Sequence, residues 1–207
     1  MENASLNSIM QAFSQMSGWE IAAALMGVAY ILLAAKESQW CWFFAFLSTV
    51  IYTVLFWEGQ LPMQALLNFY YMGMAVYGFW LWHQHGVAEA SLTISSWSWS
   101  KNLLFIMTGL IISAILTYYL TATAQSQSPA LDAYITVFSV MNTWLIAKKI
   151  LQNWLYWIII DAAAVVLYVE TAYYATALLF VLNTILAAAG LINWLKLYHQ
   201  QTAAIEA

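Results

Sequence analysis

The chain has 207 residues, of which 64% are hydrophobic and only 7% are charged, and its mean hydropathy is +0.75. A soluble domain carries roughly a quarter charged residues, so this composition excludes an ordinary soluble protein and predicts an integral membrane protein. The formal net charge of −4 argues against a nucleic-acid partner.

Residues 1–18 form a polar N-terminal segment without Lys, Arg or an apolar core, so we do not interpret it as a signal peptide. Seven later segments approach or reach the ~20 apolar residues that a membrane-spanning helix needs, which predicts an all-α fold. In chain order the predicted helices are Trp19–Ala35, Trp40–Trp57, Pro62–Trp82, Asn102–Thr121, Ala133–Ala147, Trp154–Val169 and Ala175–Tyr198. The Ser-rich stretch 83–101 is the long connection, with Trp97 and Trp99 as candidates for a short interfacial segment, and 199–207 is a C-terminal tail.

The lysines predict the orientation in the membrane. With seven helices, all five fall on one side: Lys36, Lys101, Lys148, Lys149 and Lys196. The other side carries Glu58, Asp132 and Glu170 and no lysine. Because cationic loops stay in the cytoplasm, we expect a bacterial inner-membrane protein with its N-terminus outside and its C-terminus in the cytoplasm.

The chain contains an internal repeat. A shift of 112 residues overlays the three helices of the first repeat, 19–82, on the three helices of the second repeat, 132–198, without a gap, and residues 102–121 are then a linker helix. The scarcer residues match as well as the apolar ones: Lys36 with Lys148, Trp42 with Trp154, Glu58 with Glu170, Gly78 with Gly190, and Trp82 with Trp194. This predicts a 3+1+3 fold of parallel repeats, a transporter plan whose site lies near the membrane midplane between the halves.

Asp161 is the most informative single residue, because it lies within an otherwise uncharged apolar run, 154–169. A carboxylate at this depth costs at least ~2.5 kcal/mol on insertion scales. It shares one helical stripe with Trp154, Trp157 and Tyr168. A carboxylate beside aromatic rings is the combination that a flat, cationic ligand needs.

Other polar residues recur within the predicted helices, and interhelical hydrogen bonding is the alternative role for each of them. For Trp154 and Trp157 the alternative is an aromatic belt at the membrane interface, which we favour for Trp154, next to the lysine loop, over Trp157, one turn deeper. We predict no catalytic residue, no metal site and no cofactor. The candidate substrate-binding residues are Asp161, Trp157, Tyr71, Asn68, Asn142, Asn183, Ser48, Tyr52, Trp154 and Tyr168.

The stretch from Lys148 to Trp157, followed by Asp161, resembles the PnuC-type vitamin transporters, in which a basic loop precedes W-x-x-W-x-x-x-[N/D]. The run Tyr77-Gly78-Phe79-Trp80-Leu81-Trp82 is similar to the end of that family's first half. The resemblance covers nearly the whole chain. It implies a SWEET-like fold, a homotrimer, and uptake of an unphosphorylated B vitamin by facilitated diffusion, followed by trapping through a cytoplasmic kinase.

Two positions favour the thiamin branch of that family over the nicotinamide riboside branch, which tends to have Asn where this chain has Ser48 and Asp161. An Asn side chain matches a carboxamide, whereas an ionised carboxylate only accepts hydrogen bonds and suits an exocyclic amine beside a cation. Both vitamins are cationic, so the charge alone does not decide. Nicotinamide riboside is therefore the alternative, and riboflavin is the third candidate.

Functions of other classes are less compatible with the sequence. A seven-helix retinal receptor needs a lysine deep in its last helix, and Lys196 lies at the cytoplasmic end. An intramembrane aspartyl protease needs two facing carboxylates, and Asp161 is alone at depth. Proton-coupled transport stays open, since Asp161 is a titratable group, and transport into liposomes under a pH gradient would test it.

Overall fold

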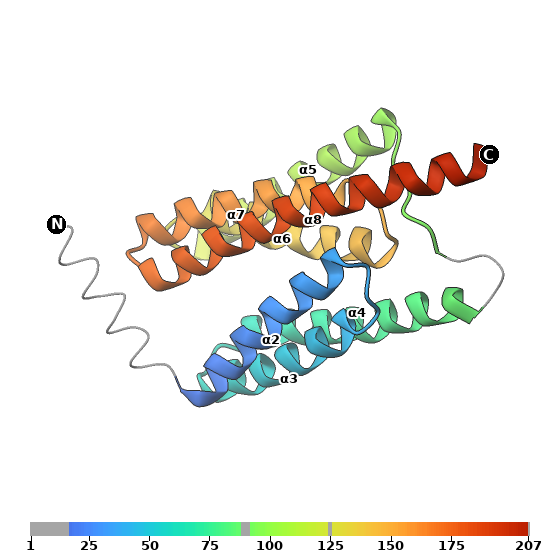
Figure 1. Cartoon of the computed structure of the whole chain (residues 1–207). Coiled ribbons are helices and arrows are strands. Elements are labelled where there is room, and N and C mark those ends of the chain that lie inside the picture. The colour runs from blue at the N-terminus through green and yellow to red at the C-terminus, as the bar shows by residue number, and fades with distance from the viewer. Residues whose placement is uncertain (1–16, 88–91, 124–125, 207) are drawn as a thin grey trace.

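The computed structural model describes residues 17–87, 92–123 and 126–206, and this part of the chain folds into seven long helices (Figure 1). They are α2 (Gly18–Ala35), α3 (Cys41–Glu58), α4 (Pro62–Val87), α5 (Trp99–Thr123), α6 (Pro129–Ala147), α7 (Asn153–Glu170) and α8 (Tyr174–Glu206). Long apolar helices are expected in a bilayer, because every backbone polar group must be satisfied within the chain. All but α4 are long and apolar enough to cross a membrane.

Local signals in the sequence account for several helix ends. A capping box begins α2: the Ser17 hydroxyl accepts from the Glu20 backbone N–H at 3.2 Å, and the Glu20 carboxylate accepts from the Ser17 N–H at 2.6 Å. Pro129 begins α6, where its missing N–H costs nothing. Helix α4 carries polar residues such as Gln64 and Asn68, which lower its hydropathy, yet it packs between α3 and α6.

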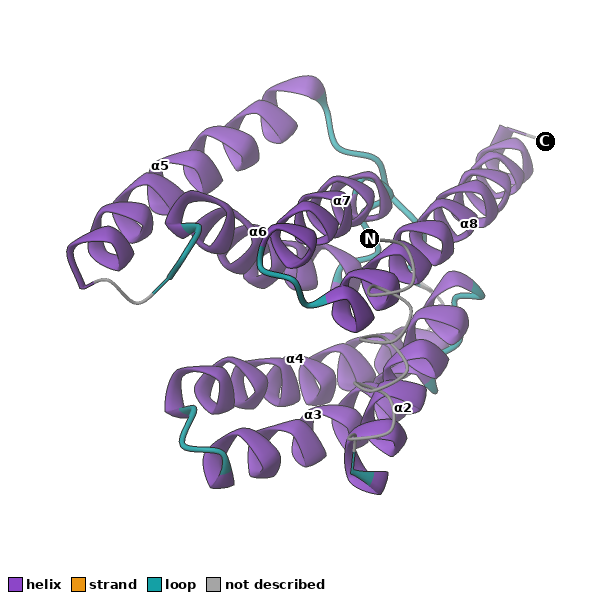
Figure 2. Ribbon diagram, turned by 90° about the vertical axis from the view of Figure 1, so that its left-hand side faces the viewer, coloured by secondary structure: helices purple, strands orange, loops and turns teal. Residues whose placement is uncertain are grey.

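The helices form two three-helix groups, α2–α3–α4 and α6–α7–α8, with α5 packed on α6 (Figure 2). Two contacts join the groups, α2 against α8 and α4 against α6. These two contacts are equivalent under the 112-residue shift, which relates α2 to α6 and α4 to α8. Each group therefore uses its first and third helices to contact the other group.

The backbone confirms the repeat. Shifting α3 by 112 residues reproduces the bounds of α7. Left-handed backbone conformations also recur at equivalent positions in the turns, at Glu37 (φ 58°) and Lys149 (φ 52°), and at Gln60 (φ 58°) and Ala172 (φ 61°). The turns that connect the helices are thus repeated as faithfully as the helices.

Some helix bounds differ from the prediction. Helix α4 continues to Val87 and α5 begins at Trp99, so the connection between them is shorter than 83–101. Helix α8 extends to Glu206, so the predicted tail from residue 199 is helical as far as residue 206. Trp99 belongs to α5 instead of a separate interfacial segment. The segment before α5 is held by main-chain hydrogen bonds, from Ser95 N to Lys149 O (3.0 Å) and from Leu151 N to Ser95 O (2.8 Å). The polar stretch 1–16 lies outside the described residues.

Four tryptophans join the two halves at the end of the bundle that carries the lysines. Trp42 and Trp82 meet edge to face with centroids 5.5 Å apart, Trp154 and Trp194 do the same at 5.5 Å, and Trp82 lies 6.3 Å from Trp194. Trp82 Nε1 donates to Ala147 O at 2.9 Å in the second half. Trp194 Nε1 donates to Ala34 O at 3.0 Å in the first half. These reciprocal bonds hold the halves together.

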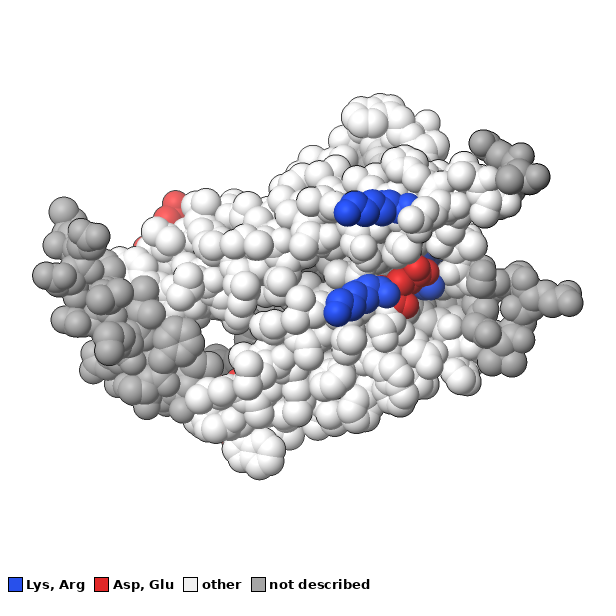
Figure 3. Space-filling model, viewed as in Figure 1, with Lys and Arg blue, Asp and Glu red and all other residues white. Residues whose placement is uncertain are grey.

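An ion pair reinforces this end. Lys149 Nζ lies 2.5 Å from Glu37 Oε1, and the two residues occupy equivalent positions of the two repeats. The same ammonium group lies 4.7 Å from the Trp82 ring centroid, within cation–π range. On the face drawn in Figure 3, basic side chains gather toward one end beside an acidic group, and further acidic atoms lie at the opposite end.

Candidate functional site

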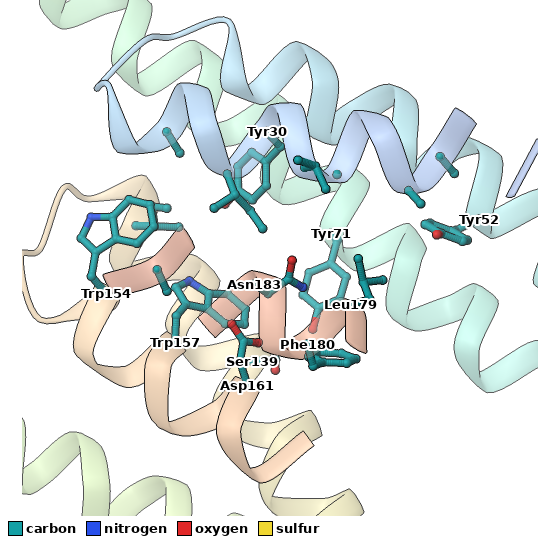
Figure 4. A pocket seen from close by; sticks show the side chains of 18 residues that line it. Tyr30, Tyr52, Tyr71, Ser139, Trp154, Trp157, Asp161, Leu179, Phe180 and Asn183 are labelled. Carbon is teal, nitrogen blue, oxygen red and sulfur yellow. The ribbon is translucent and has the colours of Figure 1, made fainter. Parts of the chain in front are cut away.

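A cavity of about 320 Å³ lies between the two halves, and its wall includes residues from α2, α3, α4, α6, α7 and α8 (Figure 4). Toward the lysine end it is bounded by buried residues, namely Ala34, Ile146, Trp154 and Ala187. Away from that end α2 and α8 diverge (Figure 1). An apolar groove lies between the two helices, and its wall includes Ile21 of α2 and Ile185 of α8. The cavity is therefore closed at the lysine end. Its volume is at the lower end of the range for small-molecule sites.

Among the described residues that line the cavity, Asp161 is the only charged one. Its side chain projects from α7 toward the cavity (Figure 4), and the residue is 5% exposed. Within the described part of the chain the carboxylate has no hydrogen bond and no ion pair. A structural role would require a partner such as Asn142, but Asn142 Nδ2 donates to Asn153 O at 2.9 Å instead. A buried charge without a partner is costly, so this position suits a carboxylate that acquires its partner from a ligand.

Aromatic rings form much of the remaining wall. Trp157 lies one helical turn before Asp161 on α7, and Tyr71 of α4 lies opposite (Figure 4). Tyr30 of α2, Tyr52 of α3 and Phe180 of α8 complete the aromatic part. These surfaces can stack on a flat ring or face a cation.

The cavity lies on the pseudo-twofold axis, because it is lined by equivalent residues from both repeats: Gly27 and Ser139, Ala34 and Ile146, and Tyr71 and Asn183. The two halves nevertheless differ in chemistry. The first contributes the tyrosines, whereas the second contributes the carboxylate of Asp161 and the amide of Asn183. A ligand here therefore meets different groups at its two ends.

The structure brings six of the ten predicted residues to this cavity: Tyr52, Tyr71, Trp154, Trp157, Asp161 and Asn183. Trp154 is 2% exposed and packs beneath Gly190, so it is not an interface-belt residue. Ser48 lines a neighbouring smaller pocket.

Three predicted residues do not line the cavity. Asn142 is fully buried in contact with Asn153. Asn68 donates to Gln64 O at 2.9 Å in its own helix. Tyr168 stacks on Phe180, a residue of the cavity wall, with ring centroids 5.3 Å apart.

Sequence reasoning missed Tyr30 and Ser139, which both line the cavity. The repeat contained a signal for one of them. Tyr30 is the equivalent of Asn142, a candidate residue, although Asn142 itself does not line the cavity. Ser139 has no such signal, because its equivalent is Gly27, which carries no side chain. No group of three or more metal-ligating side chains occurs among the described residues.

A family model described as nicotinamide mononucleotide transporter matches residues 17–196. The chain belongs to this family of membrane transporters. The nicotinamide riboside transporter PnuC of Escherichia coli is 24% identical over 202 residues, covering 86% of this chain and 84% of PnuC. The riboflavin/roseoflavin transporter RibM of Streptomyces davaonensis is 23% identical over 186 residues, covering 88% and 87%.

A solved structure has the same fold. The crystal structure of the vitamin B3 transporter PnuC superposes with a TM-score of 0.73 at 20% sequence identity, covering 94% of this chain and 88% of that chain. The expected multi-pass, all-helical transporter fold is therefore confirmed. The relatives are transporters rather than receptors or enzymes.

Proposed function

We propose that this chain carries an unphosphorylated, positively charged aromatic vitamin into the cell by facilitated diffusion. The observation that supports this most strongly is the unpartnered carboxylate of Asp161 beside the Trp157 ring, inside a cavity between the repeats. A cationic ring would compensate the carboxylate charge and stack on the indole at the same time. Neither group needs to move far to make these contacts, since both lie on α7 one turn apart.

The charge of the cavity supports an unphosphorylated ligand. No Lys, Arg or His is present among the described residues that line it, and Asp161 contributes a negative charge. Phosphate groups are bound through basic side chains or helix N-termini. Lys149 is close in sequence to this region but is held by Glu37 outside the cavity. The lining thus favours an unphosphorylated vitamin over the mononucleotide named in the family description.

Thiamin is our first candidate. Its aminopyrimidine offers a donor amine to a carboxylate that only accepts, and its thiazolium ring supplies the cation. Nicotinamide riboside is the second candidate, favoured by the name of the PnuC relative and by Asn183, whose amide can pair with a carboxamide. Riboflavin, suggested by the RibM relative, is uncharged and would leave the Asp161 carboxylate without a counter-charge.

The proposal also covers the membrane location of the chain, its orientation and its partners. We place the chain in the bacterial inner membrane with the lysine end in the cytoplasm, because all five lysines cluster at that end. A cytoplasmic kinase that traps the vitamin, and a homotrimeric assembly, are supported by the family resemblance. Helix α5 packs on α6 and contacts Tyr156 of α7, and it leaves much of its apolar surface exposed, so it is available to lipid or to a second copy.

Ligand titrations on the purified protein test the proposal. Tryptophan fluorescence and calorimetry are recorded with thiamin, nicotinamide riboside, riboflavin and thiamin monophosphate. We expect micromolar binding of thiamin and no binding of the phosphate ester. Tighter binding of nicotinamide riboside would select the second candidate, and binding of riboflavin alone would contradict the requirement for a cation.

A further inference from the structure

A second, smaller pocket of about 170 Å³ opens beside the main cavity. The two share Gly27, Tyr30, Tyr71 and Trp157 in their walls, so they adjoin each other. We call the smaller one the side pocket. Its own wall is formed by the following residues, which come from α3 and α6: Trp42, Ala45, Ser48, Thr49 and Thr143.

The hydroxyl groups of the side pocket are oriented by the backbone. Ser48 Oγ lies 2.8 Å from Ala23 O, and Thr49 Oγ1 lies 2.9 Å from Ala45 O. Thr143 Oγ1 lies 2.7 Å from Ser139 O, which belongs to the same helix. A carbonyl oxygen cannot donate, so in each contact the hydroxyl must use its single hydrogen. These three hydroxyls therefore have only lone pairs left to offer, and they can accept a hydrogen bond from a ligand but cannot donate one.

The repeat relates the side pocket to the charged part of the main cavity. Thr49 is equivalent to Asp161, and Ala45 is equivalent to Trp157. At the same depth, one half presents a carboxylate and an indole, and the other half presents a neutral hydroxyl and a methyl group. A ligand that crosses the axis would place a cationic ring on one side and a small neutral arm on the other.

We propose that the side pocket binds the hydroxyl-bearing arm of the transported molecule and recognises this arm as a hydrogen-bond donor. The inference rests on the proposed function and specifies which part of the substrate binds in the side pocket. A free alcohol donates to the Thr49 hydroxyl. The phosphate ester of that alcohol carries roughly −1.5 to −2 charges at pH 7 and acceptor oxygens. It would meet these three acceptor hydroxyls in a pocket whose described wall contains no cation. Trp42, Tyr30 and Tyr71 also line this wall, but their N–H and O–H donors are neutral and supply no counter-charge, so the side pocket separates the alcohol from its phosphate ester.

The test compares thiamin with its deoxy analogue, in which the side-chain hydroxyl is replaced by hydrogen, and with thiamin monophosphate. In the wild type we expect thiamin to bind about fivefold more tightly than the deoxy analogue, the net effect of one hydrogen bond. Thr49→Val keeps the shape and removes the acceptor, so the preference should disappear. Thr49→Ser should restore it.

Thr53→Val is the matched control. Thr53 Oγ1 makes the same kind of bond to its own helix, 2.6 Å from Thr49 O, but Thr53 lines neither pocket. The fivefold preference should survive in this variant. If thiamin and the deoxy analogue bind the wild type equally, or if Thr49→Val keeps the preference, the side-pocket proposal is wrong while the proposed function stands. If no cationic vitamin binds the wild type, both fail.

Discussion

Gly190→Ala should destabilise the protein because α7 and α8 touch at this glycine. A Cβ atom at position 190 would lie 2.6 Å from Trp154 Cε3 and Cζ3, well inside the ordinary carbon–carbon separation of about 3.5–4.0 Å. The indole cannot withdraw, because Trp154 is 2% exposed and packs edge to face on Trp194. Overpacking of this kind costs about 1–3 kcal/mol.

Gly73→Ala is the matched control. Nothing lies within 4 Å of a Cβ at position 73, which is also a helical position in α4. There the substitution should stabilise by roughly 0.5–1 kcal/mol, because Ala loses less backbone entropy than Gly. Thermal melting of both variants in the same detergent measures the difference. At about 2–4 °C per kcal/mol for a chain of this size, Gly190→Ala should melt at least several degrees below Gly73→Ala. Equal melting temperatures would refute the close-packing argument.

Three further results are expected. Glu37→Gln removes the charge that pairs with Lys149 and should lower the free energy of unfolding by about 1.5–3 kcal/mol, measured by melting; an unchanged melting temperature would mean that the pair contributes nothing. A cysteine at Ser38 should resist an impermeant thiol reagent in intact cells and one at Gln127 should react, and the reverse labelling would invert the topology. Trp157→Ala should weaken vitamin binding about tenfold to a hundredfold in a calorimetric titration, by analogy with base stacking, and normal binding would remove Trp157 from the site.

Much of the fold could be predicted because membrane-spanning helices are recognised in a sequence by their length and apolar composition. The repeat added information that hydropathy alone lacks. Equivalent positions such as Trp42 and Trp154 both lie under a glycine of the third helix in their half, Gly78 and Gly190. The ends of the helices were harder to predict from the sequence. Helix α4 continues to Val87 and α5 begins at Trp99, both within a polar stretch, because helices can continue beyond the membrane where no Pro or capping residue ends them.

The candidate site was partly predictable for a similar reason. A carboxylate in an apolar run stands out from sequence alone, so Asp161 and its stripe neighbour Trp157 were identified. Asn142 was not distinguishable from a ligand-facing residue, because an amide that binds a main-chain carbonyl looks the same in sequence as one that binds a vitamin. Tyr30 was missed because a tyrosine among many aromatic residues does not stand out by itself, and only its equivalence to Asn142 distinguishes it before helix packing directs it into the cavity.

The most direct measurement of the central claim is thiamin affinity in Asp161→Asn, titrated by calorimetry beside a melting curve on the same preparation. The variant keeps the shape but loses a charge-assisted hydrogen bond, so thiamin should bind about tenfold to a hundredfold more weakly while the ligand-free protein melts no lower than the wild type. Binding of nicotinamide riboside should appear or improve, and Asp161→Ala should be worse for every ligand. Unchanged thiamin affinity, together with a lowered melting temperature, would show that Asp161 is structural and would contradict the proposed binding site.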